Sequence, residues 1–260
     1  MTPNVPLVPN KPVVPPPTAP APPVPANVAS QATTTPTNTT QSKAGQAMLK
    51  SLQTSGIDDR PVTRFAIQPT QDDIIARVGG GDKTKGSCAS LSWTYAGNKN
   101  GLDVLDFRDG KSREFFSRRL NSELIANLDG VVSKIVESGN DLKGVHELQT
   151  AMTEGKEYVL ITGHHAAVTR KVGEAFEYLE LQSTTLGGEY GNGWHTLDDA
   201  ALRWRFSCKR SHSTYGMKYT MKNILIDIDS LNGNAEFEQI LGYINTAADK
   251  QRKGVAGGLR

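Results

Sequence analysis

Apolar side chains in the first half of the chain recur every three to four residues, which is the spacing of one buried face of a helix. Polar and glycine-rich segments interrupt this pattern and separate the predicted elements. The helices predicted from the spacing run over 44–52, 71–78 (Ile74, Ile75 and Val78 inward), 88–98, 112–128 (Phe115, Phe116 and Leu120 inward) and 145–152. A strand is predicted over 102–107, and the apolar run 131–136 fits either a strand or a helix.

In the second half, apolar and polar residues alternate, which is typical of half-buried strands. Three successive runs predict an antiparallel meander with a turn near Gly173. The predicted strands are 158–162, 165–172, 176–183 and 223–229, and the predicted helices are 194–207, after the glycine-rich loop 187–193, and 235–248. A helical first half followed by mostly antiparallel strands, without an internal repeat, predicts an α+β domain rather than a Rossmann-like alternation.

The first 43 residues differ in composition from the rest of the chain. Twelve of the 14 prolines fall within 3–36, and up to residue 42 there is no aromatic residue and Lys11 is the only charged one. Such a segment cannot bury enough apolar surface to offset the entropy lost on ordering. We therefore expect a disordered Pro/Thr-rich tail over 1–43 and one well-cored domain over 44–260.

Two interpretations of this tail remain open. Its first five prolines recur every third residue, which is the period of a polyproline II helix and is typical of a semi-rigid spacer. Charge-poor tails rich in Pro, Ser and Thr also occur as export or docking segments of injected bacterial proteins. Both interpretations predict that the tail is dispensable for the chemistry of the remaining chain.

Net charge and hydropathy exclude several classes of protein. The chain has 29 Lys and Arg against 27 Asp and Glu, and a formal charge of +2 gives no electrostatic basis for a dedicated nucleic-acid or membrane-surface binder. No segment has the roughly 18 to 20 uncharged apolar residues of a membrane span, and the start lacks the features of a signal peptide. We expect a soluble protein made in the cytosol, and two cysteines are too few for a disulfide scaffold.

Cys88 is the first candidate for chemistry. Ser87 is a suitable N-cap, which places Cys88 in the first turn of a helix, where the macrodipole and free amides favour a thiolate. Lys83 and Lys85 add positive charge. The amides of the first turn, including that of Ala89, are also placed to hold an oxyanion. An inert buried thiol is the alternative.

Two histidines stand at the start of a predicted strand. Alternation places His164 and His165 on opposite faces, so only one of them shares a face with a given partner. On the next strand Glu180 and Gln182 point away from two leucines. Across a hairpin, Glu180 or Gln182 would lie next to His165 and hold its ring. The alternative is a plain hairpin with a solvated polar face.

These segments together resemble the papain-like fold of bacterial toxins and effectors. The resemblance covers about 79–182 and rests on Gly86-Ser87-Cys88 opening a helix, Gly163-His164-His165-Ala166 on a strand and Leu179-Glu180-Leu181-Gln182 on the next strand. It implies that Cys88 is the nucleophile and that His165 is the base. It also implies that Glu180 orients the histidine and that Gln182 is the glutamine that follows the acid.

The sequence departs from the family pattern in two places. The acid is Glu rather than Asp, and no glutamine just before Cys88 corresponds to the one that helps to form the oxyanion hole in papain. If the register of the strand is shifted by one residue, His164 takes the place of His165 as the base.

The resemblance implies acyl transfer from an amide without a cofactor. His165 takes the Cys88 proton, the thiolate attacks the carbonyl, and water releases the acyl group. A backbone peptide as substrate makes the chain a protease, a glutamine side chain makes it a deamidase, and a cell-wall peptide makes it a peptidoglycan amidase. The expected protein is a thiol hydrolase that acts on a protein target as a secreted or delivered toxin or virulence effector, with an immunity protein or a secretion chaperone as possible partner.

Other arrangements of His and Cys residues are less well supported. A metal site is not expected, because adjacent histidines on a strand diverge and the segment that begins at His146 lacks the second histidine of a zincin helix. The loop 79–84 lacks the spacing of a phosphate-binding loop. Cys208 is expected to be a buried thiol, although a disulfide with Cys88 would remove the nucleophile. His195 either lines a cleft or lies on the surface.

The aromatic residues Trp93, Tyr95 and Trp204 are predicted to belong to the core rather than to a stacking platform. The alternative to an enzyme is a phage- or secretion-associated structural protein whose papain-like domain only binds. That alternative predicts that Cys88→Ala behaves like the parent chain in every assay.

Overall fold

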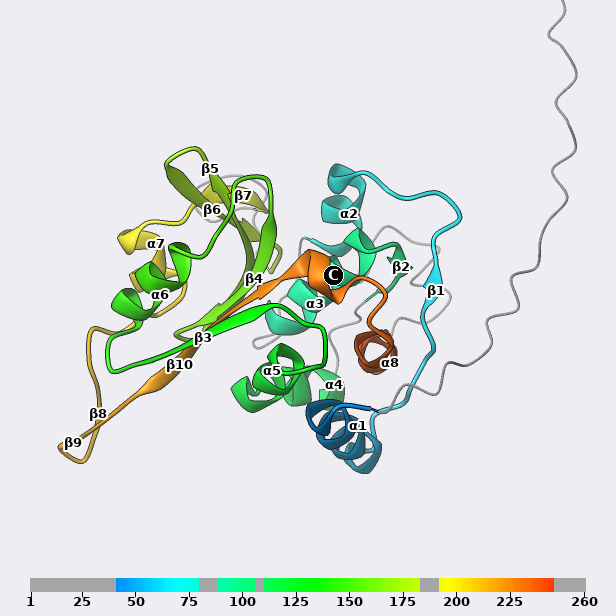
Figure 1. Cartoon of the computed structure of the whole chain (residues 1–260), viewed down its shortest axis with the longest axis horizontal. Helices are drawn as coiled ribbons and strands as arrows, with labels where there is room; N and C mark the ends of the chain where they lie inside the picture. Colours follow the sequence, from blue (N-terminus) through cyan, green and yellow to red (C-terminus); the bar gives the residue numbers. More distant parts are fainter. Residues whose placement is uncertain (1–40, 80–87, 106–109, 183–191, 246–260) are drawn as a thin grey trace, which may run out of the picture. The chain divides into compact units, whose positions relative to one another are not determined.

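A computed structural model of the chain describes residues 41–79, 88–105, 110–182 and 192–245. In these residues, helices pack on both faces of an antiparallel sheet (Figure 1), which confirms the predicted α+β class. Most of the predicted tail lies outside the described residues, so the division into 1–43 and 44–260 stays a prediction.

The main sheet of the described residues has six strands in the order β3-β10-β4-β5-β6-β7, and every neighbouring pair is antiparallel. The predicted meander is confirmed as β4, β5 and β6, and the run 131–136 contributes a strand rather than a helix. The six strands are β3 (Ser133–Ser138), β10 (Met221–Asp227), β4 (Glu157–Thr162), β5 (His165–Val172), β6 (Ala175–Glu180) and β7 (Gly193–Thr196).

Alternation along the strands divides their side chains between two cores. On β4, Val159 and Ile161 face the larger core, whereas Tyr158 and Leu160 face the smaller one. The elements around the larger core are α1 (Lys43–Ser55), α2 (Gln71–Val78), α3 (Cys88–Lys99), α4 (Gly110–Phe116), α5 (Arg119–Ala126), the 3-10 helix η1 (Ile228–Leu231) and α8 (Ala235–Gly242). Those of the smaller core are α6 (Asp141–Gln149) and α7 (Asp199–Trp204).

Helix α3 lies inside the larger core. All residues from 89 to 98 are buried, and Trp93 and Tyr95 belong to the core as predicted. Asn98 is buried at the other end of the helix, where its side chain donates hydrogen bonds to two main-chain carbonyls. Because α3 packs against β5, its first residue, Cys88, is held beside the start of that strand.

The single helix predicted over 112–128 is wrong. The chain forms α4 and α5 instead, because Arg118 has an extended backbone between them. This break changes the phase of the second helix, so Leu120 is 65% exposed rather than inward. Phe115 and Phe116 are buried as predicted.

The helix predicted over 194–207 is also wrong. Its beginning forms β7, which pairs with β6, and only α7 is helical. The sequence of β7, Gly-Trp-His-Thr, is too short to show an alternating pattern, and its contacts with β6 come from distant residues. Trp204 at the end of α7 is 77% exposed, so it does not belong to the core as predicted.

Other predicted elements differ at their ends. The strand predicted over 102–107 is limited to β2 (Leu102–Asp103), which pairs with the unpredicted β1 (Thr63–Arg64), and residues 106–107 lie outside the described residues. The last helix ends at Gly242, α1 is longer than predicted, and α6 begins four residues earlier and ends three residues earlier than predicted. A hairpin of β8 (His212–Thr214) and β9 (Met217–Tyr219) was not predicted.

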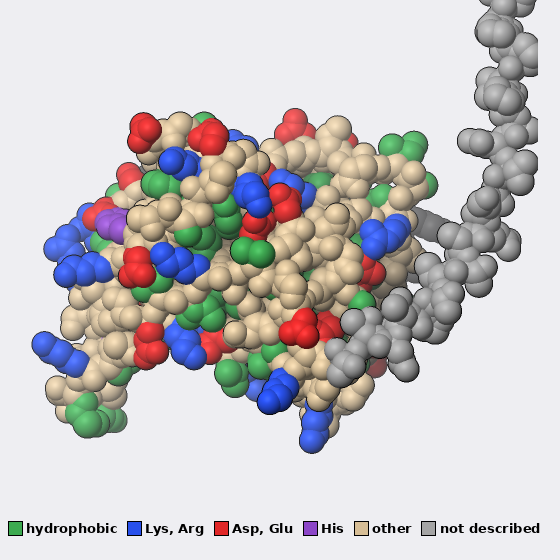
Figure 2. Space-filling view, viewed as in Figure 1, with side chains coloured by type: hydrophobic (Ala, Val, Ile, Leu, Met, Phe, Trp, Pro, Cys, Tyr) green, Lys and Arg blue, Asp and Glu red, His purple; other side chains and the backbone are tan. Residues whose placement is uncertain are grey.

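Acidic and basic side chains are interspersed over the face shown in Figure 2, where apolar side chains gather at the tip of the β8–β9 hairpin. Tyr215 and Met217 at this tip are 97% and 71% exposed. Among the described residues, no helix combines the length and the hydrophobicity needed to cross a membrane.

Candidate active site

Cys88 is the first residue of α3, and its side chain is half-buried at the edge of a cavity. The amides at the start of a helix have no partners within the helix, and the positive end of the macrodipole stabilises an anion there. The fold therefore places this thiol in the first turn of a helix, as predicted, whereas Lys83 and Lys85 lie outside the described residues. Ser87, the predicted N-cap, lies outside the described residues.

His165 is the first residue of β5, and its imidazole forms a hydrogen bond with the Cys88 thiol. Burial alone would raise the pKa of Cys88, but the hydrogen bond and charge of His165, with a hydrogen bond from the Ala166 backbone, outweigh burial and lower it. Burial alone would lower the pKa of His165, but Cys88 and Glu180 raise it. The two shifts favour a thiolate beside an imidazolium.

Glu180 lies behind His165, at the end of β6, and its side chain is fully buried. Oε2 of Glu180 is 3.7 Å from Nε2 of His165, which is the distance of an ion pair rather than of a hydrogen bond. Burial alone would raise the pKa of Glu180, but His165 and Arg205 outweigh burial and lower it to about 2. Since Nε2 faces the carboxylate, Nδ1 is left for the thiol.

Arg205, directly after α7, is a member of this site that the sequence analysis missed. Its guanidinium donates hydrogen bonds to both carboxylate oxygens of Glu180, with 3.0 Å from one terminal nitrogen to Oε1. The same nitrogen donates to the side-chain Oε1 of Gln182 at 3.3 Å, and the main-chain N–H of Gln182 donates to Oε1 of Glu180 at 2.8 Å. A buried carboxylate needs such partners to remain charged, and no local pattern connects residues so far apart in the chain.

Aromatic packing fixes the orientation of the histidine ring. The rings of His165 and Phe206 meet edge to face, with centroids 4.9 Å apart, and Phe206 in turn packs edge to face on Tyr178. Phe206 follows Arg205 directly, so the same short segment holds both the acid and the imidazole.

The turn between β4 and β5 fixes the position of His165 at the start of β5. Gly163 has a φ of +53°, and a Cβ there would lie 2.1 Å from the carbonyl oxygen of Phe206. The same carbonyl accepts a hydrogen bond of 2.7 Å from the amide of His164, and the Arg119 guanidinium donates to the carbonyl of Gly163. Glycine is therefore required here both for its backbone conformation and for the close packing.

The thiol opens into a cavity of about 300 Å³. Ala89, whose amide is predicted to hold the oxyanion, and His164, the alternative base, both line it, and the side chain of His164 is exposed to solvent. It is His165, not His164, that contacts both the thiol and the carboxylate. The other lining residues are Ser117, Arg119, Ser122, Ile161, Gly163, Ala166 and Met221.

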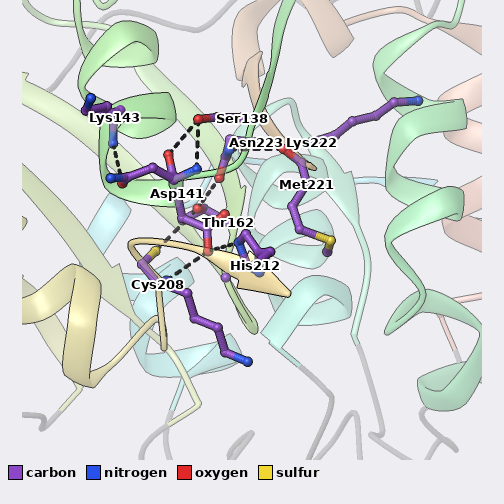
Figure 3. A network of polar contacts seen from close by, with 12 residues as sticks. Ser138, Asp141, Lys143, Thr162, Cys208, His212, Met221, Lys222 and Asn223 are labelled. Atoms are coloured by element: carbon purple, nitrogen blue, oxygen red, sulfur yellow. Dashed lines mark hydrogen bonds and ion pairs between the residues drawn. The ribbon is translucent and has the colours of Figure 1, made fainter. Parts of the chain in front are cut away.

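The second cysteine lies in a separate buried network, shown in Figure 3. Both cysteines are free thiols, and Cys208 Sγ is 3.4 Å from Oγ1 of Thr162, which donates to Asn223. Beside them Asp141 pairs with His212 at 2.9 Å. Burial is the main reason that the pKa of Cys208 rises to about 11. Cys208 is therefore the buried thiol that the sequence predicts and is protonated near neutral pH.

The remaining histidines have other contacts. His146 pairs with Asp199 at 2.9 Å, and the ring of His195 packs against Tyr178 with centroids 5.5 Å apart. In the part of the chain that the structure describes, no three His, Cys, Asp or Glu side chains are grouped so that they could hold a metal ion.

No protein-family model, no curated protein and no solved structure matches this chain.

Proposed function

We propose that this chain is a papain-like cysteine hydrolase that cleaves amide bonds. The observation that carries the proposal is the hydrogen-bonded pair of Cys88 and His165 at the start of a buried helix, with Glu180 behind the imidazole. The pair opens into a cavity that has room for a substrate side chain or a peptide segment. A thiolate with an adjacent base, which a third group orients, is the constellation required for nucleophilic catalysis.

In the first half of the reaction, the Cys88 thiolate attacks the carbonyl carbon of the amide and forms a carbon–sulfur bond. The negative charge moves to the carbonyl oxygen, where the free amides at the start of α3 stabilise it, including that of Ala89. The imidazolium of His165 then donates its proton to the leaving nitrogen, and the carbon–nitrogen bond breaks. The leaving group is ammonia for a glutamine side chain and an amine for a peptide.

In the second half, neutral His165 accepts a proton from water while the water oxygen attacks the thioester. The carbon–sulfur bond breaks, a carboxylic acid is released, and the thiolate and imidazolium are restored. Glu180 remains ionised throughout because of its low pKa, and it stabilises the imidazolium in both half-reactions.

The proposed substrate is a glutamine side chain or a peptide bond of a protein target in another cell. The proline-rich composition of 1–43 supports a delivered toxin or effector, made in the cytosol and exported with the tail unfolded. In this proposal an immunity protein or a secretion chaperone covers the domain before delivery.

The test is incubation of the chain with glutamine-containing peptides, folded proteins and cell-wall muropeptides. Ammonia release with a deamidated product identifies a deamidase, new peptide termini identify a protease, and cleaved muropeptides identify an amidase. Cys88→Ala should abolish the activity, whereas Cys208→Ala, the matched cysteine control, should retain it. Product formation by Cys88→Ala equal to that of the parent would contradict the proposal, and a parent chain that forms no product from any of these substrates would favour a protein that only binds.

A further inference from the structure

Arg119, the first residue of α5, lines the same cavity as Cys88. Its guanidinium donates hydrogen bonds to the main-chain carbonyls of Gly163 and Lys222. A guanidinium has five N–H donors in a rigid plane, so these two bonds fix its orientation and leave donors for a further acceptor.

No ion pair within the described residues neutralises Arg119. The two described acids that act most on its charge have other partners: Glu123 pairs with Lys222 at 2.7 Å, and Asp141 pairs with His212 at 2.9 Å. Burial lowers the pKa of Arg119, although an arginine remains protonated. Its charge is therefore incompletely hydrated and lacks a counter-ion among these residues.

The charges around the thiol are also predominantly positive. The imidazolium of His165 offsets the thiolate of Cys88, and Glu180, which lies behind the imidazole, is bound to Arg205. Once these two pairs are set against each other, the positive charge of Arg119 is not balanced by another charge among the described residues of the cavity. Planar guanidinium groups bind carboxylates through two parallel hydrogen bonds, and such bonds are stronger where water is partly excluded.

We propose that this cavity is a carboxylate-binding subsite and that the hydrolase acts on an amide next to a free carboxylate, as in an acidic or chain-terminal peptide segment. This inference rests on the proposed function. Ile161 and Met221 provide an apolar wall for the aliphatic part of such a group, and Ser117 and Ser122 bring hydroxyls to the same cavity.

The test compares two alkylating reagents of similar size, one with a carboxylate and one with a neutral carboxamide. Iodoacetate and iodoacetamide alkylate a thiolate by the same displacement, in which a carbon–sulfur bond forms and iodide leaves, but only iodoacetate carries a carboxylate. The ratio of their rate constants at Cys88 therefore measures the local preference for a carboxylate. A general change in thiol reactivity affects both rate constants equally and cancels in this ratio. The imidazolium of His165 also attracts iodoacetate, but it does so in every variant, so this contribution cancels when the ratios of two variants are compared.

Three variants isolate the charge of Arg119. Arg119→Gln removes the charge but keeps an amide donor for the two carbonyls, and Arg119→Lys keeps the charge. Arg118→Gln is the matched control, because Arg118 is exposed and pairs with Glu114 at 2.9 Å. We expect the ratio of iodoacetate to iodoacetamide rates to fall roughly three- to tenfold in Arg119→Gln. In Arg119→Lys and in Arg118→Gln it should stay within about twofold of the parent.

An unchanged ratio in Arg119→Gln, or an equal fall in Arg118→Gln, would overturn the subsite. A parent chain in which Cys88 reacts with neither reagent would overturn the proposed function and the subsite with it. Reactivity towards both reagents with no effect of Arg119 would overturn the subsite alone.

A second measurement needs only the parent chain and identifies the source of the carboxylate. Three acetylated peptides of equal length are compared for their protection of Cys88 against iodoacetamide. One has a Glu side chain and an amidated C-terminus, one has Gln and a free C-terminal carboxylate, and one has Gln and an amidated C-terminus. Better protection by either charged peptide supports the subsite and identifies its ligand, whereas equal protection by all three overturns it.

Discussion

Replacing Glu180 by Gln should weaken the thiolate–imidazolium pair, because it removes the negative charge behind His165. The two groups are 3.7 Å apart and both are buried. At an effective dielectric constant of about 20, their attraction is about 4 kcal/mol. Arg205 repels the imidazolium in both proteins, so it does not change this difference. The carboxylate also repels the thiolate on the other side of the imidazole, so we take a net effect on the ion pair of about half, or about 2 kcal/mol. This free energy corresponds to about 1.5 pKa units.

The assay is the pH dependence of iodoacetamide alkylation at Cys88, followed by mass spectrometry. Without the Glu180 charge, the pKa of His165 falls and the apparent pKa of Cys88 rises, so the midpoint of alkylation should move up by about 1.5 pH units. Glu177→Gln is the control, because it removes a carboxylate from the same strand that pairs with Arg170 at a partly exposed position. Its midpoint should stay within about 0.3 units of the parent. An unchanged midpoint in Glu180→Gln would refute the reasoning that Glu180 sustains the imidazolium.

Three further predictions concern stability and the second cysteine. The pKa of Glu180 is about 2 against an ordinary 4.5, so its ionised form stabilises the fold above pH 4.5 and this contribution is lost as the pH falls towards 2. In acid denaturation the parent should therefore lose about 3 kcal/mol more than Glu180→Gln, and equal losses would contradict this assignment. Gly163→Ala should lower the free energy of unfolding in urea by at least about 3 kcal/mol, because its Cβ would lie 2.1 Å from a main-chain oxygen. Gly130→Ala, at a φ of +78° with no atom within 4 Å, should cost only about 1 to 2 kcal/mol, and equal costs would argue against the close packing. Cys208→Ala should leave the alkylation rate of Cys88 unchanged, because burial keeps the second thiol protonated, and a slower rate would indicate coupling between the two cysteines.

The parts of the fold that could be predicted from the sequence have local patterns. Alternation over β4, β5 and β6 predicts the meander, and the residues around Cys88 predict a helix that begins at the thiol. The same patterns predict the three residues of the proposed catalytic site, which are Cys88, His165 and Glu180. A strand of four residues such as β7 has no such pattern, and the break at Arg118 depends on how α4 and α5 pack rather than on a helix-breaking residue.

The remaining parts of the site depend on contacts between distant segments. Arg205 reaches Glu180 only because α7 packs on the same face of the sheet, and Arg119 reaches the turn at Gly163 from another helix. In the sequence, each arginine stands in an apolar–basic segment that resembles an ordinary surface helix. The need for Arg205 comes from the burial of Glu180, which sequence spacing does not reveal, since a fully buried carboxylate must be neutralised.

The most direct test of the central claim is titration of the thiolate by its ultraviolet absorbance. The difference between the parent and Cys88→Ala reports the ionisation of Cys88 alone, and the same difference in a His165→Ala background removes the imidazolium. We predict that Cys88 ionises well below its ordinary pKa of 9.0 in the parent, and near or above that value without His165. Ionisation at the ordinary pKa of a thiol in both backgrounds would contradict a thiolate–imidazolium pair and, with it, the proposed hydrolase.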